Sequence, residues 1–366
     1  MYKYLRFGFI FSLCLLIIIQ FISCDLLNEV DTGGDDDNLV WIEWSNNGIN
    51  PQIYYVSTTG SDESSGTGEN SAFRTLAKAF RIVQTGGTIR VLPGTYNEAI
   101  GLINCGNLAA PITVTGYNDT PVLDGLDSET MGIFCEECTN MIFNNLIFQN
   151  YTDIGIGVSF CNTFTLQNLI VRENGHAVQL TEWELEGYGI HVEESENIVI
   201  ENNDAYNNGP NPQIVPDYLM GTGINTYANR NVIIRDNLSH GNTGGGFLVE
   251  DSHNVLFEGN KAYENDCDAS VDEWWDAGLW VDGGGDVIVR NNIFRDNLGA
   301  GIEISDEDLQ NPTGYVLENN ICTGNYFGIF IWNFGTTDWP DESVIKNINN
   351  QFTGNTQQDV WIENWY

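Results

Sequence analysis

The sequence has few basic residues. Among its 366 residues, 13 are Lys or Arg and 51 are Asp or Glu, so the formal net charge is −38. Such a surface repels nucleic acid and anionic lipid, and we therefore exclude a nucleic-acid partner. The sequence also lacks a phosphate-binding loop, a dinucleotide fingerprint and a Gly-x-Ser-x-Gly elbow in a strand–helix context. An acidic surface instead suits solubility, divalent cation capture or a saline habitat.

The N-terminus has the pattern of an export signal. Lys3 and Arg6 precede an apolar stretch over residues 7–22, and the small Ser23 stands before Cys24. This arrangement resembles a bacterial lipoprotein signal, and the resemblance implies that Cys24 carries the lipid. An uncleaved membrane anchor is the alternative.

The export signal sets the expected domain organisation. We predict a signal peptide at residues 1–23, an acidic flexible tether at 24–50 and one folded domain at 51–366. The protein would then be a monomer, exported and lipid-anchored to the bacterial cell envelope or cell surface. It would touch the membrane only through its N-terminal lipid.

Short phrases that begin with glycine recur along the middle of the chain. They are Gly155-Ile-Gly-Val, Gly189-Ile-His-Val, Gly223-Ile-Asn-Thr, Gly246-Phe-Leu-Val, Gly278-Leu-Trp-Val, Gly301-Ile-Glu-Ile and Gly328-Ile-Phe-Ile. Further apolar strands that end in asparagine lie between them, as in Ile200-Glu-Asn-Asn203 and Val289-Arg-Asn-Asn292. Repeats at this spacing, with strands of a few residues, predict an all-β parallel β-helix, a solenoid of stacked coils.

The recurring asparagines point to a structural ladder. We expect them to stack at one inward turn, where their amides satisfy one another and the turn backbone. The members of this expected ladder are Asn145, Asn168, Asn203, Asn237, Asn260, Asn292 and Asn320.

Two cysteines occupy the same place in consecutive repeats. Cys138 and Cys161 each lie six residues after a repeat glycine, Gly132 and Gly155. Adjacent coils are roughly 4.8 Å apart, close to the separation that a disulfide tolerates. A disulfide and a reduced stacked pair both remain open.

The start of the folded part predicts a helical cap. Phe73, Leu76, Phe80 and Val83 have helical spacing, and terminal repeats of a solenoid must be covered. The flanking stretches are Tyr54-Tyr-Val-Ser-Thr-Thr-Gly-Ser-Asp and Gly87-Thr-Ile-Arg-Val-Leu-Pro-Gly-Thr-Tyr96. This opening resembles extracellular right-handed β-helix proteins, including family nine polysaccharide lyases. The resemblance implies a right-handed, pectin-lyase-like solenoid that acts on a polysaccharide.

Insertions on one side of the solenoid predict a binding groove. They lie at residues 176–187, 210–220 and 266–276, each just before a glycine-led strand. Insertions confined to one face commonly mark the binding face. Along the strands that would floor this groove, alternate residues point outward in two columns. The first column is His191, Asn225, Leu248, Trp280, Glu303 and Phe330, and the second is Glu193, Tyr227, Glu250, Asp282, Ser305 and Trp332.

The first candidate chemistry is elimination from a uronate-containing glycan, which needs a base, a proton donor and a group that neutralises the substrate carboxylate. His191 would be the base and Tyr227 the acid, and Asn225 or a bound Ca²⁺ the neutraliser. Ca²⁺ would use oxygen ligands from Glu193, Glu250 and Asp282. Family nine lyases use a lysine base, and neither column contains lysine. We favour a pectate-lyase-like activity because of the resemblance, not because of the residues.

The second candidate is a glycoside hydrolase. Glu250 and Asp282 lie one coil apart, roughly 5 Å, which matches a retaining carboxylate pair. Glu250 and Glu303 lie two coils apart, roughly 10 Å, near the upper limit for an inverting pair. Asp282 and Glu303 are diagonal neighbours and form a third possible pair. Columns without positive charge suit a neutral glycan better than a uronate.

The third candidate is glycan binding without catalysis. Trp280, Phe330 and Trp332 would contact sugar rings, together with Trp274 and Trp275 from the third insertion. In the same insertion, a calcium ion could bind to four carboxylates. These carboxylates are Asp268, Asp272, Glu273 and Asp276.

Overall fold

A computed structural model describes most of the chain from Leu39 onward. The described residues are 39–44, 48–176, 184–185, 187–210, 218–219, 221–267, 275–308, 310, 312–332 and 344–363. They belong to one compact unit, Leu39–Tyr366. The predicted signal peptide and the Cys24 lipidation site lie outside the described residues. Among the described helices, none is long and apolar enough to cross a bilayer.

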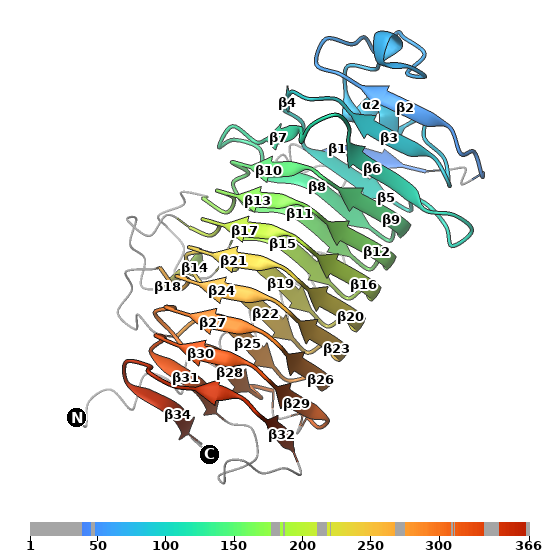
Figure 1. The fold of residues 1–366 in the computed structure, drawn as a ribbon. Coiled ribbons are helices and arrows are strands. Elements are labelled where there is room, and N and C mark those ends of the chain that lie inside the picture. The colour runs from blue at the N-terminus through green and yellow to red at the C-terminus, as the bar shows by residue number, and fades with distance from the viewer. Residues whose placement is uncertain are drawn as a thin grey trace. The chain divides into compact units, whose positions relative to one another are not determined.

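The described strands form a right-handed parallel β-helix with three long sheets, as predicted (Figure 1). Sheet A, of 11 strands, contains β1 (Val40–Glu43), β5 (Ile100–Ile103), β8 (Met131–Glu136), β11 (Ile154–Ser159), β15 (Tyr188–Glu193), β19 (Ile224–Tyr227), β22 (Phe247–Glu250), β25 (Leu279–Asp282), β28 (Ile302–Ser305), β31 (Phe327–Trp332) and β34 (Gln358–Glu363). Neighbouring strands are parallel throughout, so each coil adds one strand to each sheet.

The other two long sheets complete each coil. Sheet B, of 11 strands, contains β2 (Ile53–Val56), β3 (Thr88–Val91), β6 (Ile112–Gly116), β9 (Thr139–Asn144), β12 (Asn162–Gln167), β16 (Glu196–Glu201), β20 (Arg230–Arg235), β23 (His253–Glu258), β26 (Gly285–Arg290), β29 (Tyr315–Glu318) and β32 (Ile345–Ile348). Sheet C, of 10 strands, contains β4 (Thr95–Tyr96), β7 (Val122–Asp124), β10 (Ile147–Gln149), β13 (Ile170–Arg172), β17 (Asp204–Tyr206), β21 (Leu238–His240), β24 (Lys261–Tyr263), β27 (Ile293–Arg295), β30 (Ile321–Thr323) and β33 (Gln351–Phe352).

Two short strands link the first two insertions. β14 (Glu184–Leu185) and β18 (Tyr218–Leu219) pair in parallel, so the two insertions stack on each other at this point. Most of the other insertion residues lie outside the described part of the chain.

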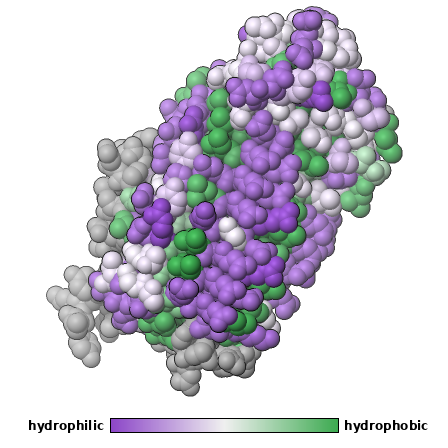
Figure 2. All heavy atoms as spheres, in the orientation of Figure 1, coloured by the Kyte–Doolittle hydropathy of each residue, from purple (hydrophilic) through white to green (hydrophobic). Residues whose placement is uncertain are grey.

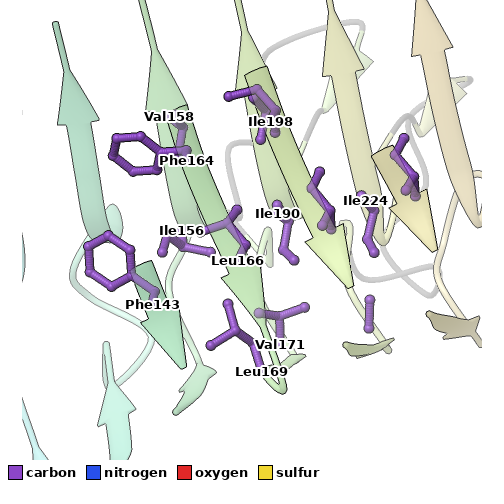
Figure 3. Packing of buried hydrophobic residues seen from close by; sticks show 14 of the residues in the cluster. Phe143, Ile156, Val158, Phe164, Leu166, Leu169, Val171, Ile190, Ile198 and Ile224 are labelled. Atoms are coloured by element: carbon purple, nitrogen blue, oxygen red, sulfur yellow. The ribbon is translucent and has the colours of Figure 1, made fainter. Parts of the chain in front are cut away.

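The interior is a continuous column of aliphatic and aromatic side chains. Ile156, Ile190 and Ile224 lie in line in successive coils and point inward, as Figure 3 shows. All three are fully buried. Successive strand residues point to opposite faces, so the residues beside these isoleucines point out of the coil. On the outside, hydrophilic side chains cover most of the face in Figure 2.

The asparagine ladder exists, but two of its expected members are not in it. In the ladder, each main-chain N–H donates to the side-chain oxygen of the asparagine one coil further on, as from Asn203 to Asn237 at 2.9 Å. The ladder runs through Asn203, Asn237, Asn260, Asn292, Asn320 and Asn350. At this turn the earlier coils place Leu146 and Leu169, and the Leu169 N–H donates to Asn203. Asn145 and Asn168 precede those leucines and adopt positive φ instead.

A second asparagine ladder explains the repeat glycines. It runs through Asn174, Asn208, Asn242, Asn265, Asn297, Asn325 and Asn355. A Cβ atom at Gly189 would lie 2.9 Å from Nδ2 of Asn208, and one at Gly278 would lie 2.8 Å from Nδ2 of Asn297. Glycine therefore recurs because a larger residue would collide with this ladder.

The cysteines belong to a third ladder. The Cys105 N–H donates to the Cys138 sulfur at 3.4 Å, and the Cys138 N–H to the Cys161 sulfur at 3.2 Å. Serine and asparagine take the same position in later coils, beginning with Ser195. Cys138 and Cys161 are thus stacked as expected, and both are free thiols.

The N-terminal end is capped by a short helix, as predicted. Helix α2 (Leu76–Phe80) follows the single turn η1 (Glu69–Ser71), and Thr75 caps α2 by accepting the Lys78 N–H. Strand β1 pairs with β5 in sheet A. It lies within residues 24–50, so the sheet begins inside the range that we expected to be a tether.

Candidate functional site

The outer face of sheet A carries the two predicted columns. The strand register pairs His191 with Asn225 and Leu248 with Trp280, then Trp280 with Glu303 and Glu303 with Phe330. The second column is equally regular, because Glu193 pairs with Tyr227, Glu250 with Asp282 and Asp282 with Ser305. These registers leave neighbouring side chains roughly 5 Å apart along each column.

From β22 to β31, these outward side chains are not the open floor that the sequence suggests. Trp280 is 8% exposed and Trp332 4%, while Glu303 and Phe330 are fully buried. The three aromatic residues among them belong to a second apolar cluster, separate from the interior core. Its buried members are Leu248, Ala277, Trp280, Ala300, Phe327, Phe330 and Trp332. Trp275, Tyr326 and Trp361 pack against this cluster and extend it to an aromatic layer. Trp280 and Phe330 of this layer flank Glu303 in the first column.

The aromatic rings of this layer contact one another across coils. The ring centres of Trp275 and Trp332 are 5.5 Å apart, and those of Phe330 and Trp361 are 5.1 Å apart. Such distances are typical of packed aromatic pairs. Trp280, Phe330 and Trp332, which we expected to bind sugar, therefore pack mainly on protein. Of the two insertion tryptophans, Trp275 joins the layer and Trp274 lies outside the described residues.

Asp282 is held by two hydrogen-bond donors within this covered region. Its Oδ1 atom accepts from Ser305 Oγ at 2.5 Å and from the Glu307 N–H at 3.1 Å. The Trp280 indole N–H donates to the same Ser305 oxygen at 2.7 Å. Burial raises the pKa of Asp282 to about 7, and the two donors offset only part of that shift. Asp282 thus keeps its proton far closer to neutral pH than an ordinary aspartate.

Glu303 is more deeply enclosed than Asp282. Its Oε1 atom accepts the Trp332 indole N–H at 2.5 Å. Within the described part of the chain, its Oε2 atom is buried and makes no hydrogen bond. Burial raises the pKa of Glu303 well above its usual value and so favours its protonated form. A fully enclosed acid cannot reach a substrate, which removes the basis for the inverting pair and for the diagonal pair with Asp282.

Glu250 and Tyr227 lie on the more open side of Asp282. Both are partly exposed, and Glu250 sits between Tyr227 and Asp282 in the second column. Burial, followed by the charge of Glu250, raises the pKa of Tyr227 to about 12. Tyr227 is therefore a protonated phenol at neutral pH. Glu307, next to Asp282, also has a pKa raised to about 8 by burial and by the Asp282 charge. Its side chain is partly exposed, whereas Asp282 is buried.

His191 lies in a separate polar cluster on β11, β15 and β19. Its Nδ1 atom is 3.1 Å from Nδ2 of Asn225, and its Nε2 atom is 3.4 Å from Oε2 of Glu193. An amide nitrogen can only donate, so Nδ1 accepts and the ring proton is on Nε2, facing Glu193. Both ring nitrogens are thus engaged. Burial tends to raise the pKa of Glu193, but hydrogen bonds from His191 and Ser159 outweigh it and lower the pKa.

The calcium ligands predicted in the second column do not meet at one point. Tyr227 separates Glu193 from Glu250 in the second column, so Glu193, Glu250 and Asp282 span three coil steps, roughly 14 Å. Calcium ligands must lie about 2.3–2.6 Å from the ion, so this set cannot hold one. Asp276 is described and buried, whereas Asp268, Asp272 and Glu273 lie outside the described residues. Among the residues with a described position, no three His, Cys, Asp or Glu side chains are grouped to bind a metal.

Two residues that contact Asp282 were not predicted as site residues from the sequence. Ser305 stands in the second column, but nothing in a single serine shows that it bonds Asp282. Glu307 contributes a backbone N–H from the segment after β28. Every residue except proline has a backbone N–H, so the residue type does not reveal this donor. Only the fold shows the contact.

Comparisons with known proteins agree with this fold. The family described as right handed beta helix region matches residues 183–356, and a protein family of unknown function, DUF1565, matches residues 58–118. The uncharacterized protein YwoF of Bacillus subtilis (strain 168) is 40% identical over 72 residues, which span 19% of this chain and 15% of that relative.

Solved structures share the architecture at low sequence identity. Pectate lyase Pel9A matches with a TM-score of 0.57 and 16% identity, covering 80% of this chain and 75% of that one. An alginate lyase from Paenibacillus sp. str. FPU-7 matches with a TM-score of 0.45 and 14% identity, covering 76% of this chain and 95% of that one. At 16% identity, the likeness to pectate lyase Pel9A concerns the fold alone.

Proposed function

We propose that this protein cleaves a polysaccharide on the outer face of sheet A, with Asp282 as general acid and Glu250 as its partner carboxylate. The observation that carries the proposal is the pairing of these two residues in adjacent coils, with unlike surroundings. Burial keeps Asp282 protonated up to about pH 7, whereas Glu250 is partly exposed. Two neighbouring carboxyl groups in unlike environments are the usual arrangement for acid-assisted glycoside cleavage.

The separation of the pair favours a retaining hydrolysis. In-register residues one coil apart place their carboxyl groups roughly 5 Å apart, as retaining enzymes require. Glu250 would bond to the anomeric carbon while the glycosidic C–O bond breaks and its oxygen takes the proton of Asp282. Water would then give a proton to the Asp282 carboxylate, and its oxygen would displace Glu250 from the sugar. The second step restores both side chains.

The charges of the site favour a neutral glycan as substrate. From β15 to β31, neither outward column contains Lys or Arg. A uronate would thus meet the negative charges of Glu193 and Glu250 and no basic side chain in these columns. A neutral glycan carries no charge and is therefore not repelled by these side chains. The likeness to pectate lyase Pel9A supports a polysaccharide as the substrate class, although it concerns the fold.

Elimination from a uronate is the second candidate, with His191 as base and Tyr227 as acid. One observation favours it, because Tyr227 stays protonated and can donate a proton. The lone pair of His191 Nδ1, however, already accepts from Asn225. Asn225 would have to turn away before His191 could act as base.

The proposed location is the outside of a bacterial cell. Cys24 would carry a lipid that tethers the solenoid to the envelope, where polysaccharides are within reach. Calcium is not part of the proposed step, because Glu193, Glu250 and Asp282 lie too far apart to bind one ion together.

The test is a screen of the full chain on neutral and uronate-containing polysaccharides. Two products are followed together, namely new reducing ends and the ultraviolet absorbance of unsaturated uronates. We expect reducing ends without that absorbance, on a neutral glycan. A parallel rise in both would overturn hydrolysis in favour of elimination. Glycan binding without either product would make the protein a binding module.

A further inference from the structure

A chain of hydrogen bonds ends on one oxygen of Asp282. It begins at the Trp280 indole N–H, which lies 2.7 Å from Ser305 Oγ. An indole N–H can only donate, so Ser305 accepts this bond. Trp280 is 8% exposed and Ser305 is fully buried, so water does not compete at this step. The first bond therefore sets the orientation of the Ser305 hydroxyl.

The second bond follows from the first. A serine hydroxyl has one proton to donate, and the Asp282 Oδ1 atom lies 2.5 Å from Ser305 Oγ. Because Trp280 occupies an acceptor position of Ser305, the hydroxyl proton points to Asp282. The Glu307 backbone N–H, which also can only donate, reaches the same Oδ1 atom at 3.1 Å. Oδ1 of Asp282 thus accepts two hydrogen bonds.

An oxygen that already accepts two hydrogen bonds is less easily protonated than one that accepts none. Protonation of Oδ1 would bring its hydrogen into the space that the donors of Ser305 and Glu307 occupy. The acid proton is consequently held on the other carboxyl oxygen, Oδ2.

We infer that Ser305, oriented by Trp280, is a positioning residue that keeps the acid proton of Asp282 on Oδ2, from which it passes to the leaving oxygen. This inference rests on the proposed role of Asp282 as general acid. Ser305 touches no substrate in this account and acts through Asp282 alone. Its register partner in the next coil is Trp332.

The inference makes a measurable claim about the protein without substrate. The hydrogen bond from Ser305 stabilises the charged form of Asp282 and so lowers its pKa. Ser305→Ala removes this donor, and we expect the pKa of Asp282 to rise above its wild-type value. The measurement is a pH titration of the full chain, carrying ¹³C-labelled aspartate, by NMR. Asp282→Asn identifies the signal.

Activity provides a second readout. In Ser305→Ala we expect kcat to fall about tenfold or more with KM nearly unchanged, because the proton is no longer held on one oxygen. The basic limb of the pH profile should move to higher pH together with the pKa of Asp282. Ser305→Thr, which retains the hydroxyl, should restore both values. A residue with a merely structural role would move neither the pH profile nor the titration.

Two further variants separate positioning from a loss of packing. Ser239→Ala removes another fully buried serine hydroxyl, which donates to the Gly246 carbonyl away from this site. It should leave the pKa of Asp282 and kcat unchanged. Trp280→Phe keeps a ring in place but removes the N–H, so we expect a shift in the same direction as Ser305→Ala and smaller. This variant also serves as the test if Ser305→Ala fails to fold.

The outcomes distinguish this inference from the proposed function. If Asp282→Asn retains full activity, Asp282 is not the acid and the proposed function is wrong. If Asp282→Asn is inactive while Ser305→Ala keeps the wild-type pKa and pH profile, Asp282 acts without Ser305 and the inference is wrong. If the pKa rises in Ser305→Ala and Ser305→Thr reverses the change, the inference holds.

Discussion

The outer face of sheet A has two regions that share one register and differ in protonation. The histidine region, on β11, β15 and β19, contains Ser159, His191, Glu193 and Asn225. The carboxyl region, on β22, β25, β28 and β31, contains Glu250, Asp282 and Glu303. Hydrogen-bond donors lower the pKa of Glu193 in the first region. Burial raises the pKa of Asp282 and Glu303 in the second.

The difference between the two regions comes from what covers them. Glu193 has a side chain that is 33% exposed and a histidine beside it, so its charge is solvated and paired. Glu303 lies under aromatic rings and is fully buried. Transfer of a carboxylate from water to such surroundings is so costly that the group keeps its proton instead. Two glutamates on the same face of one sheet, Glu193 and Glu303, can thus differ in their tendency to carry a charge.

The largest expected effect is on catalysis and separates the two regions directly. Asp282→Asn keeps the shape of the side chain but has no acid proton, so we expect kcat to fall by about 10²–10⁴ on the cleaved polysaccharide. His191→Ala should reduce kcat far less, because acid-assisted cleavage does not use it. The measurement is kcat for both variants, with circular dichroism to verify folding. A severe loss in His191→Ala with little loss in Asp282→Asn would move catalysis to the histidine region.

The next effect is on stability and tests the aromatic cover. Phe330→Ala removes a fully buried ring from the carboxyl region, so we expect the free energy of unfolding to fall by about 3–5 kcal/mol. Phe134→Ala is the matched control, because Phe134 stands on β8 in the same outward column but is only partly buried. We expect Phe134→Ala to lower the free energy of unfolding by less than Phe330→Ala does. Denaturant unfolding of both variants measures the difference. An equal decrease in the free energy of unfolding would mean that Phe134 and Phe330 are buried to the same extent.

The smallest effect is on the pH dependence of stability, which should have opposite signs in the two regions. The raised pKa of Asp282 provides stability that is fully present below the ordinary aspartate pKa and is lost as pH rises through about 7. The lowered pKa of Glu193 provides stability that is present above the ordinary glutamate pKa and is lost as pH falls through the folded-state value.

Melting temperatures recorded between about pH 3 and pH 9 check both signs. Asp282→Asn should remove part of the loss toward neutral and alkaline pH, and Glu193→Gln should remove part of the loss at acid pH. Identical pH profiles for wild type and both variants would contradict the assigned charge states.

Much of the scaffold was predictable because a solenoid repeats one coil. Period-2 alternation along the glycine-led strands placed Ile190 and Ile224 inside and His191 and Asn225 outside, and the strand register confirms this. The helical cap was predictable from the spacing of its apolar residues. Asn145 and Asn168 were misplaced by one residue, because asparagine also favours the positive φ that the preceding turn position requires.

The sequence by itself determined the coil, its register and the identity of the neighbours in each column, because these follow from local periodicity repeated at nearly constant length. Only the tertiary structure decided which of those neighbours meet water. Trp280, Phe330 and Trp332 come from the two coils beside Glu303 and meet there, because the first two are its register partners and the third donates its indole N–H to it. Burial is a property of all the chain segments that converge on a side chain, and the charge state of a carboxyl group depends on burial. The proposed acid proton of Asp282 is therefore a product of the fold.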